Sequence, residues 1–189
     1  SQVLISEEGH IIIHRRKLMP TGEERTIWGM GDATSLKVVD TSIGKTGMLI
    51  CYEHSMPLSR YSLYGLGEEI HIAMWPGANY KSQPRDRKKI IDVAMRNMTF
   101  EGQVYTVYSS SCVGSEELKF YLELDPSNQG ILEEGGGISG IVDPISNYIA
   151  GPIEDKEQIV YAEINLDNIV NVKHMIDSVG HYARPDVFQ

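Results

Sequence analysis

The 189-residue chain has few cysteines, little positive charge and no long apolar segment. Its two cysteines, Cys51 and Cys112, are too few for a disulfide framework, so we expect a reducing, cytoplasmic setting. The formal net charge of -9 and the pI near 5.1 argue against a nucleic-acid partner, because such partners need a basic surface. No apolar run reaches the roughly 18 residues of a membrane span, and no signal-peptide pattern opens the chain. We therefore expect no membrane partner.

The remaining composition is that of a folded domain, with 41% apolar residues to form a core. We expect one domain over residues 1–189 with α/β (α+β) layers, because strand and helix patterns alternate along the chain. Three helices are predicted. The first starts at Pro57 and ends at Gly65 or Gly67, the second runs from the capping residue Asp86 to about Phe100, and the third covers 167–175. Predicted strands cover 3–5, 10–13, 36–39, 47–51, 70–75, 104–110, 138–142, 147–150 and 158–164. The segments 20–32, 76–84 and 114–137 are predicted to be irregular or loops.

Cys51 ends the apolar run 47–51, and the polar residues Glu53 and His54 follow it. A free cysteine on a strand is most often a small buried hydrophobe. The polar residues after it favour another interpretation, a partly exposed thiol at the rim of a sheet. A cation near such a thiol would lower its pKa and favour the thiolate.

Lys17 ends a second apolar run that begins at Ile11. Alternation along a strand places Arg15 and Lys17 on one face, so part of this basic cluster is expected to be buried and paired. Glu23 and Glu24 are close enough in sequence to be its partners. A thiol and an ammonium at neighbouring strand ends form a candidate site for covalent catalysis.

The histidines are scattered, and no two of them combine ligand spacing with a matching carboxylate. We therefore predict no metal site and no cofactor. A Cys–His pair stays open on spacing alone, although no histidine stands in a supporting motif. Cys112 follows three serines at a strand end and is expected to be structural, and Gly135–Gly137 lacks the lysine and helix start of a phosphate loop.

Several motifs, in order and at matching spacing, resemble the nitrilases of the carbon–nitrogen hydrolase superfamily. They are the lysine region 14–21 with Glu24-Arg25, Trp28-Gly29 and Gly31-Asp32, the nucleophile region 47–58, Glu101-Gly102, Gly151-Pro152 and the segment 180–186. The resemblance implies a four-layer αββα sandwich and a Glu-Lys-Cys triad. It places the lysine on Lys17, the nucleophile on Cys51 and a second glutamate of the family on Glu24.

The general-base glutamate of the family stands well upstream of the lysine and has no counterpart here. Glu7 and Glu8 lie in a predicted hairpin turn and lack the family's sequence context. The chain thus resembles the C-terminal two-thirds of a nitrilase, and we expect the N-terminal part to be absent from it.

By the same resemblance, the substrate is a small nitrile or amide, with Tyr52, Trp75 and Pro76 lining its pocket and the backbone N–H of Tyr52 serving as an oxyanion donor. Relatives form dimers that build into spirals, so a homo-oligomer is expected, possibly together with a separate N-terminal segment. Tyr52 stands where nitrilases usually carry Trp. This departure keeps an amidase or carbamoylase open, and the absent glutamate keeps open a non-catalytic homologue or fragment.

Overall fold

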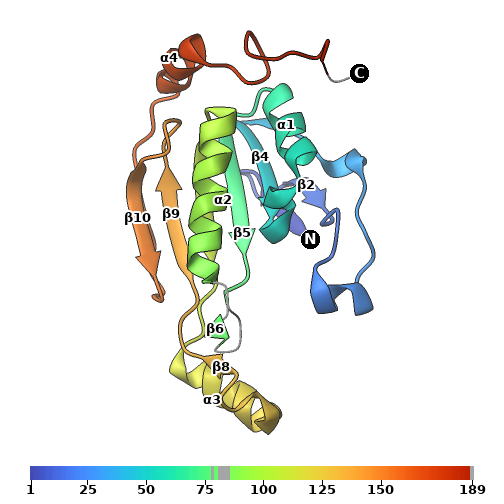
Figure 1. Cartoon of the computed structure of the whole chain (residues 1–189), viewed down its shortest axis with the longest axis vertical. Coiled ribbons are helices and arrows are strands. Elements are labelled where there is room, and N and C mark those ends of the chain that lie inside the picture. Colours follow the sequence, from blue (N-terminus) through green and yellow to red (C-terminus); the bar gives the residue numbers. More distant parts are fainter. Residues whose placement is uncertain (78, 81–85, 188–189) are drawn as a thin grey trace.

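The computed structural model describes residues 1–77, 79–80 and 86–187, and Figure 1 traces the path of the chain. The α-helices are α1 (Pro57–Gly65), α2 (Arg87–Gly102), α3 (Ser115–Leu124) and α4 (Asp167–Met175). The strands are β1 (Gln2–Ile5), β2 (Ile11–Arg15), β3 (Val39–Thr41), β4 (Gly44–Ile50), β5 (Ile70–Trp75), β6 (Asn79–Tyr80), β7 (Tyr105–Ser110), β8 (Leu132–Glu133), β9 (Ile138–Val142) and β10 (Tyr148–Glu154). Short 3-10 helices include Gly22–Thr26 and Cys51–Ser55.

A six-stranded mixed sheet is the centre of the fold, with the order β10-β9-β7-β5-β4-β3. The strands β4, β5 and β7 are parallel to one another, and the outer pairings are antiparallel. Their connections are the helices α1 and α2, which lie on the same face of the sheet (Figure 1). This is the arrangement expected when two successive right-handed crossovers step in one direction across a sheet.

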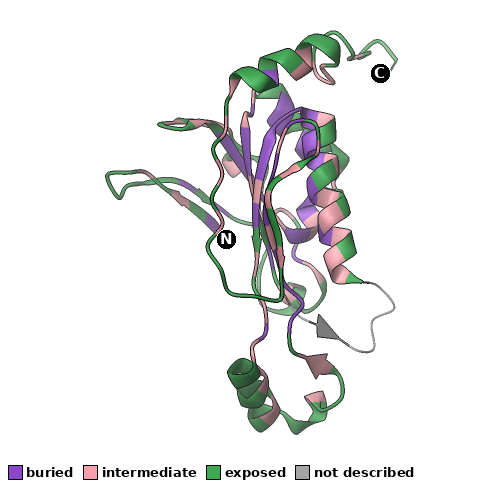
Figure 2. Cartoon of the chain, turned by 90° about the vertical axis from the view of Figure 1, so that its left-hand side faces the viewer, coloured by how far each residue is buried: buried purple, intermediate pink, exposed green. Residues whose placement is uncertain are grey.

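The other face of the sheet carries the β1–β2 hairpin, which lies across from the helices in Figure 2. The hairpin is tied to the sheet by the Gln2 side chain, whose Nε2 donates a hydrogen bond of 3.0 Å to the Leu49 carbonyl in β4. The order of layers is therefore helices, sheet and hairpin. This is an α/β sandwich, as the sequence predicts.

The core lies between the sheet and the helices, where Figure 2 shows the buried residues concentrated. The predicted apolar stripe of α2 faces this core through Ile91, Met95 and Met98, which are fully buried, while Ala94 is half-buried. One cluster gathers Ile91 and Met95 around Cys51, and a second joins Met98 to α1. The α2 stripe thus links the core beneath the cysteine to the core beneath α1.

Several predicted elements are confirmed and others are wrong. The strand 70–75, the helix 167–175 and the start of α1 at Pro57 match the structure. The strand predicted over 36–39 begins three residues later, at Val39, and ends at Thr41. The segment 114–137 is not all loop, because it contains α3 and β8. The predicted loop 76–84 lies partly outside the described residues.

The segment 158–164 is not a strand, contrary to its alternating pattern. The alternation is real, since Ala162 and Ile164 are half-buried while Tyr161 and Glu163 are exposed. Within the part of the chain that is described, however, no strand runs beside it to complete a hydrogen-bonded ladder. Side-chain periodicity alone does not make a strand without a pairing partner.

Among the described residues, no helix has both the length and the apolar character that crossing a bilayer requires.

Candidate active site

A pocket of about 560 Å³ opens at the carboxyl ends of β4 and β5. In open α/β sheets with parallel strands, this edge is where ligands bind, because the strands end there in loops that can carry polar groups. The pocket is lined by Cys51 and Tyr52 after β4, by Pro76 and Gly77 after β5, and by further residues that include Lys17, Thr21, Glu23, Glu24, Arg87 and Tyr121. The topology thus brings the predicted cysteine and lysine to one cavity.

Cys51 is the first residue of the 3-10 helix that follows β4. Its φ of 52° is in the left-handed region, which costs a non-glycine residue of the order of 1 kcal/mol or more. The side chain is buried, and burial raises the pKa of the thiol despite the opposing charge of Lys17 and the backbone N–H of Tyr52. The predicted partial exposure of the thiol is therefore wrong, and at neutral pH the resting group is a thiol rather than a thiolate.

Lys17 lies just beyond β2, and its ammonium is held by two side chains of the neighbouring turn. Nζ donates to Glu24 Oε2 at 2.6 Å and to Thr21 Oγ1 at 2.9 Å. Burial by itself would raise the pKa of Glu24, but the hydrogen bonds from Lys17 and from the Thr21 backbone lower it overall. Glu24 is therefore ionised at neutral pH, and it fixes a charged ammonium at the pocket wall.

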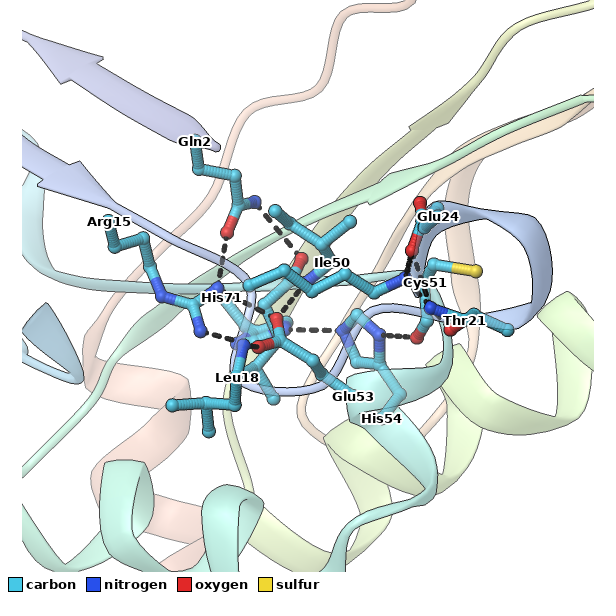
Figure 3. A network of polar contacts seen from close by, with 12 residues as sticks. Gln2, Arg15, Leu18, Thr21, Glu24, Ile50, Cys51, Glu53, His54 and His71 are labelled. Carbon is cyan, nitrogen blue, oxygen red and sulfur yellow. Dashed lines mark hydrogen bonds and ion pairs between the residues drawn. The ribbon is translucent and has the colours of Figure 1, made fainter. Parts of the chain in front are cut away.

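Glu53 connects the lysine segment to the cysteine segment, as Figure 3 shows. Its carboxylate accepts two hydrogen bonds of 2.7 Å from the Arg15 guanidinium, one of 2.6 Å from the Leu18 N–H and one of 2.7 Å from the Ile50 N–H. Leu18 follows Lys17 and Ile50 precedes Cys51, so one buried carboxylate fixes both backbones. Burial would raise the pKa of Glu53, but these donors, led by Arg15, lower it.

A second polar chain lies beneath the cysteine and consists of His54, His71 and Glu68. His54 Nδ1 lies 2.7 Å from the Cys51 carbonyl oxygen, and its Nε2 lies 2.9 Å from His71 Nε2. His71 Nδ1 is in turn 2.7 Å from Glu68 Oε1. All three side chains are buried.

Of the three residues predicted to line the substrate pocket, two lie at the cavity and one lies in the core. Tyr52 and Pro76 line the cavity beside Cys51. Trp75 is not among its lining residues, because it is buried in the core, where its ring stacks on His54 with centroids 5.2 Å apart and meets Tyr52 edge-on at 5.8 Å. Trp75 therefore supports the pocket wall from behind.

Three features of this site are absent from the sequence-based prediction. Glu53 and His54 are buried rather than part of an exposed polar turn. His71 carries a signal that was available, since a histidine within the apolar strand 70–75 needs a buried partner. Arg87, at the start of α2, lines the pocket, but nothing in its sequence context marks it.

Histidine and carboxylate groups do not gather into a cation site here. Over the described ranges, no group of three or more His, Cys, Asp or Glu side chains has the arrangement of a metal centre. The described pocket lining offers the thiol of Cys51, the ammonium of Lys17, the guanidinium of Arg87 and the carboxylates of Glu23 and Glu24.

The whole-chain comparison decides the family. The model of the carbon–nitrogen hydrolase family matches residues 1–174. The chain belongs to the carbon–nitrogen hydrolase family. The resemblance identified from the lysine and nucleophile motifs is thus confirmed.

Curated relatives of this carbon–nitrogen hydrolase chain are nitrilases. It is 38% identical over 191 residues to an aliphatic nitrilase of Rhodococcus rhodochrous, with 99% of this chain and 50% of that protein covered. It is 39% identical to an arylacetone-specific nitrilase of Alcaligenes faecalis, covering 98% of this chain and 52% of that protein. The chain therefore spans about half the length of the curated relatives that it matches.

Solved structures agree on the fold. A carbon–nitrogen hydrolase from Helicobacter pylori G27 superposes with a TM-score of 0.80 at 24% identity, covering 97% of this chain and 62% of that one. An amidase from Nesterenkonia sp. AN1, with acrylamide added at its active-site cysteine, superposes with a TM-score of 0.65 at 14% identity, covering 92% and 60%. The α/β sandwich is thus that of the nitrilase superfamily.

Proposed function

We propose that the protein is a nitrilase that hydrolyses an organic nitrile to a carboxylic acid and ammonia, with Cys51 as its nucleophile. The observation that carries this proposal is the shared pocket. Cys51 stands in a left-handed turn at the pocket wall, and the Lys17–Glu24 ion pair lines the same cavity. Nitrilase relatives at 36–39% identity support the choice of substrate class.

The reaction begins when the thiol loses its proton to a base and the sulfur forms a bond to the nitrile carbon. The nitrogen takes up a proton, which gives a thioimidate. Water adds to the carbon, the carbon–nitrogen bond breaks, and ammonia leaves a thioester. A second water cleaves the carbon–sulfur bond, which releases the acid and regenerates the thiol of Cys51.

Lys17 would stabilise the negative charge that develops on the substrate, together with the backbone N–H of Tyr52, the residue next to Cys51. One preorganised donor of this kind contributes about 3 kcal/mol to the transition state. Glu24 would hold the ammonium in place and aimed at the pocket. Thr21 would restrict its remaining freedom.

The scheme also needs a base that takes the proton of the Cys51 thiol, and the described pocket residues do not supply one. Among the described side chains that line the pocket, the carboxylates are Glu23 and Glu24. Glu24 is engaged by Lys17, and its lowered pKa makes it a poor proton acceptor. We propose that the base is a carboxylate outside these 189 residues, in keeping with relatives about twice as long.

The test is to incubate the naturally expressed protein with matched nitrile and amide substrates of the same acyl group and to measure ammonia. We expect acid and ammonia from the nitrile, and a covalent adduct on Cys51 by intact mass. Cys51→Ala should fold and release no ammonia. Residual nitrile hydrolysis by that variant would refute the nucleophile.

An amidase or carbamoylase is the second candidate, and Tyr52 is the observation that favours it. Tyr52 occupies the pocket wall beside Cys51, where nitrilases usually carry a larger indole. Faster turnover of the amide than of the matched nitrile would select this function.

We also propose that the chain works in an oligomer. The β1–β2 hairpin exposes Val3, Ile5, Ile11 and Ile12, an apolar surface that association would cover. Sedimentation of the naturally expressed protein as a monomer would contradict this.

A further inference from the structure

The buried chain Cys51 carbonyl–His54–His71–Glu68 has only a few possible arrangements of its protons. A carbonyl oxygen can only accept, so His54 Nδ1, 2.7 Å away, must carry a hydrogen. In a neutral imidazole the other nitrogen is then bare. His54 Nε2 is therefore the acceptor in the 2.9 Å contact with His71, and His71 Nε2 is the donor.

The same argument continues to Glu68. If His71 is neutral, its Nδ1 is bare, and the 2.7 Å contact needs a proton on Glu68 Oε1. If His71 is instead an imidazolium, Glu68 must be a carboxylate. The surroundings decide between these two states.

The surroundings favour the neutral acid. Glu68 is buried, and its second oxygen, Oε2, has no hydrogen-bond partner among the residues that the structure describes. A buried carboxylate with an unsatisfied oxygen is far more costly than a neutral carboxylic acid. Burial also raises the pKa of Glu68 well above its usual range, against the opposing charge of Lys173, and lowers the pKa of His71 to about 3.

We propose that Glu68 is a protonated carboxylic acid that fixes the proton order of His71 and His54 and so holds the carbonyl of the nucleophile, Cys51. Glu68, His71 and His54 are positioning residues, because they act on the reaction through the Cys51 backbone. This inference rests on the proposed function in taking Cys51 as the nucleophile.

Cys51 is a residue for which such support matters. Its left-handed backbone persists only if surrounding contacts over-determine it, and the His54 hydrogen bond to its carbonyl is one of these contacts. The His54 ring is itself fixed, since it stacks on Trp75 with an interplanar angle of 21°. Loss of the chain would leave the Cys51 peptide free to relax and would move the thiol.

Gly47 makes room for the chain. It pairs with His71 across β4 and β5, and a Cβ atom there would lie 2.1 Å from Glu68 Oε1. A side chain at this position of β4 would therefore displace the acid.

The test uses two substitutions in the naturally expressed protein and the rate of Cys51 alkylation by iodoacetamide. Glu68→Gln keeps a donor toward His71 without any charge, so we expect an alkylation rate within about twofold of wild type. Glu68→Leu removes the donor and should change the rate about tenfold, the equivalent of one buried hydrogen bond. Leu63→Ala, in the core cluster beneath α1, is the control that lowers stability and keeps the Leu63 carbonyl that accepts a hydrogen bond from the Glu68 N–H.

Two outcomes would overturn the inference. An alkylation rate as strongly changed in Glu68→Gln as in Glu68→Leu would mean that the charge of a carboxylate is required. A Glu68→Leu rate equal to wild type would mean that the chain has no positioning role. If Glu68→Leu does not fold, ¹⁵N NMR of the wild-type histidines decides, and an imidazolium signal from His71 at neutral pH contradicts a protonated Glu68.

The rate of Cys51 alkylation is measured without a nitrile, so this test does not depend on the proposed hydrolysis. A protein that hydrolyses no nitrile yet shows this alkylation pattern would refute the proposed function and leave the inference intact.

Discussion

Glu53 and Glu24 are two carboxylates of one site with different surroundings. The Glu53 side chain is fully buried and accepts four hydrogen bonds, whereas a third of the Glu24 side chain is exposed. Glu53 therefore has mainly an architectural part, and we propose that Glu24 acts through the ammonium of Lys17. Neutralising each should affect different measurements.

Glu53→Gln should lower the free energy of unfolding by about 3–5 kcal/mol, because it leaves the buried Arg15 charge without its partner. Urea denaturation at pH 7 measures this. The control is Glu101→Gln, which breaks the more exposed ion pair with Arg60 and should cost clearly less. Equal losses in the two variants would contradict the assigned role of Glu53.

Glu24→Gln should reduce kcat about tenfold to a hundredfold with little change in stability, because the ammonium of Lys17 loses the charge that holds it. The ammonia-release assay and thermal unfolding, run side by side, separate the two effects. Glu23→Gln is the matched control, since Glu23 lines the same pocket but is exposed. A drop of similar size in both variants would count against an ion-pair role.

At the scale of elements, α2 carries core and pocket together. Its inward stripe packs beneath Cys51, and its first residue, Arg87, reaches the pocket. Asp86 is the N-cap residue of α2, and its side chain accepts a hydrogen bond of 3.3 Å from the Lys89 N–H. The sequence predicts this capping residue because a short acidic side chain precedes the apolar stripe.

Asp86→Ala should cost about 1 kcal/mol through loss of the cap, which lowers the melting temperature by about 2–4 °C for a chain of this size. Asp86→Asn retains an acceptor and should melt close to wild type. Scanning calorimetry of the three proteins makes the comparison. The cap is unimportant if the alanine variant melts with the asparagine variant.

The elements that the sequence misassigns differ in cause. The helix Ser115–Leu124 has Leu118, Tyr121 and Leu122 at helical spacing, but it stands in a polar, glycine-rich segment and has no fully buried residue. The segment 158–164 has the alternation of a strand but no pairing strand in the described regions. The first error overlooks a short periodic pattern, and the second takes periodicity alone as evidence of a strand.

At the scale of the whole molecule, the buried histidines make stability depend on pH. Burial lowers the pKa of His71 to about 3 and that of His54 well below its usual value, with Arg15, Arg60 and Glu53 as the charges around them. Below about pH 6.5, His54 and His71 therefore bind protons in the unfolded chain but not in the folded protein. This effect lowers stability as the pH falls.

Glu68 acts in the opposite sense. Because its pKa is raised in the folded protein, folding retains a proton that the unfolded chain releases above about pH 4.5, and this contribution to stability is lost as the pH rises. Near pH 5.5, where both histidines of the unfolded chain are largely protonated, wild type should lose about 1.4 kcal/mol per pH unit as the pH falls, from two histidine protons less one glutamate proton. Glu68→Gln should lose about twice as much. Urea midpoints at several pH values measure both slopes, and parallel slopes would show that Glu68 does not titrate between the two states.

The sequence by itself determined the local features of this protein. Three local patterns can be recognised from neighbouring residues in the sequence alone. They are the apolar run ending at Cys51, the basic cluster ending at Lys17 and the inward stripe of α2. The proximity of Glu24 to Lys17 belongs here too, since only seven residues separate them.

Only the tertiary structure decided what surrounds the thiol. Glu53 meets Arg15 across 38 residues, and His54 meets His71 across 17, because β4 and β5 pair in parallel and the hairpin packs on their sheet. Burial then reverses the expected direction of the Cys51 pKa, since desolvation outweighs the charge of Lys17. Charge balance and solvent exclusion depend on all the atoms around a group, and a one-dimensional pattern does not contain them.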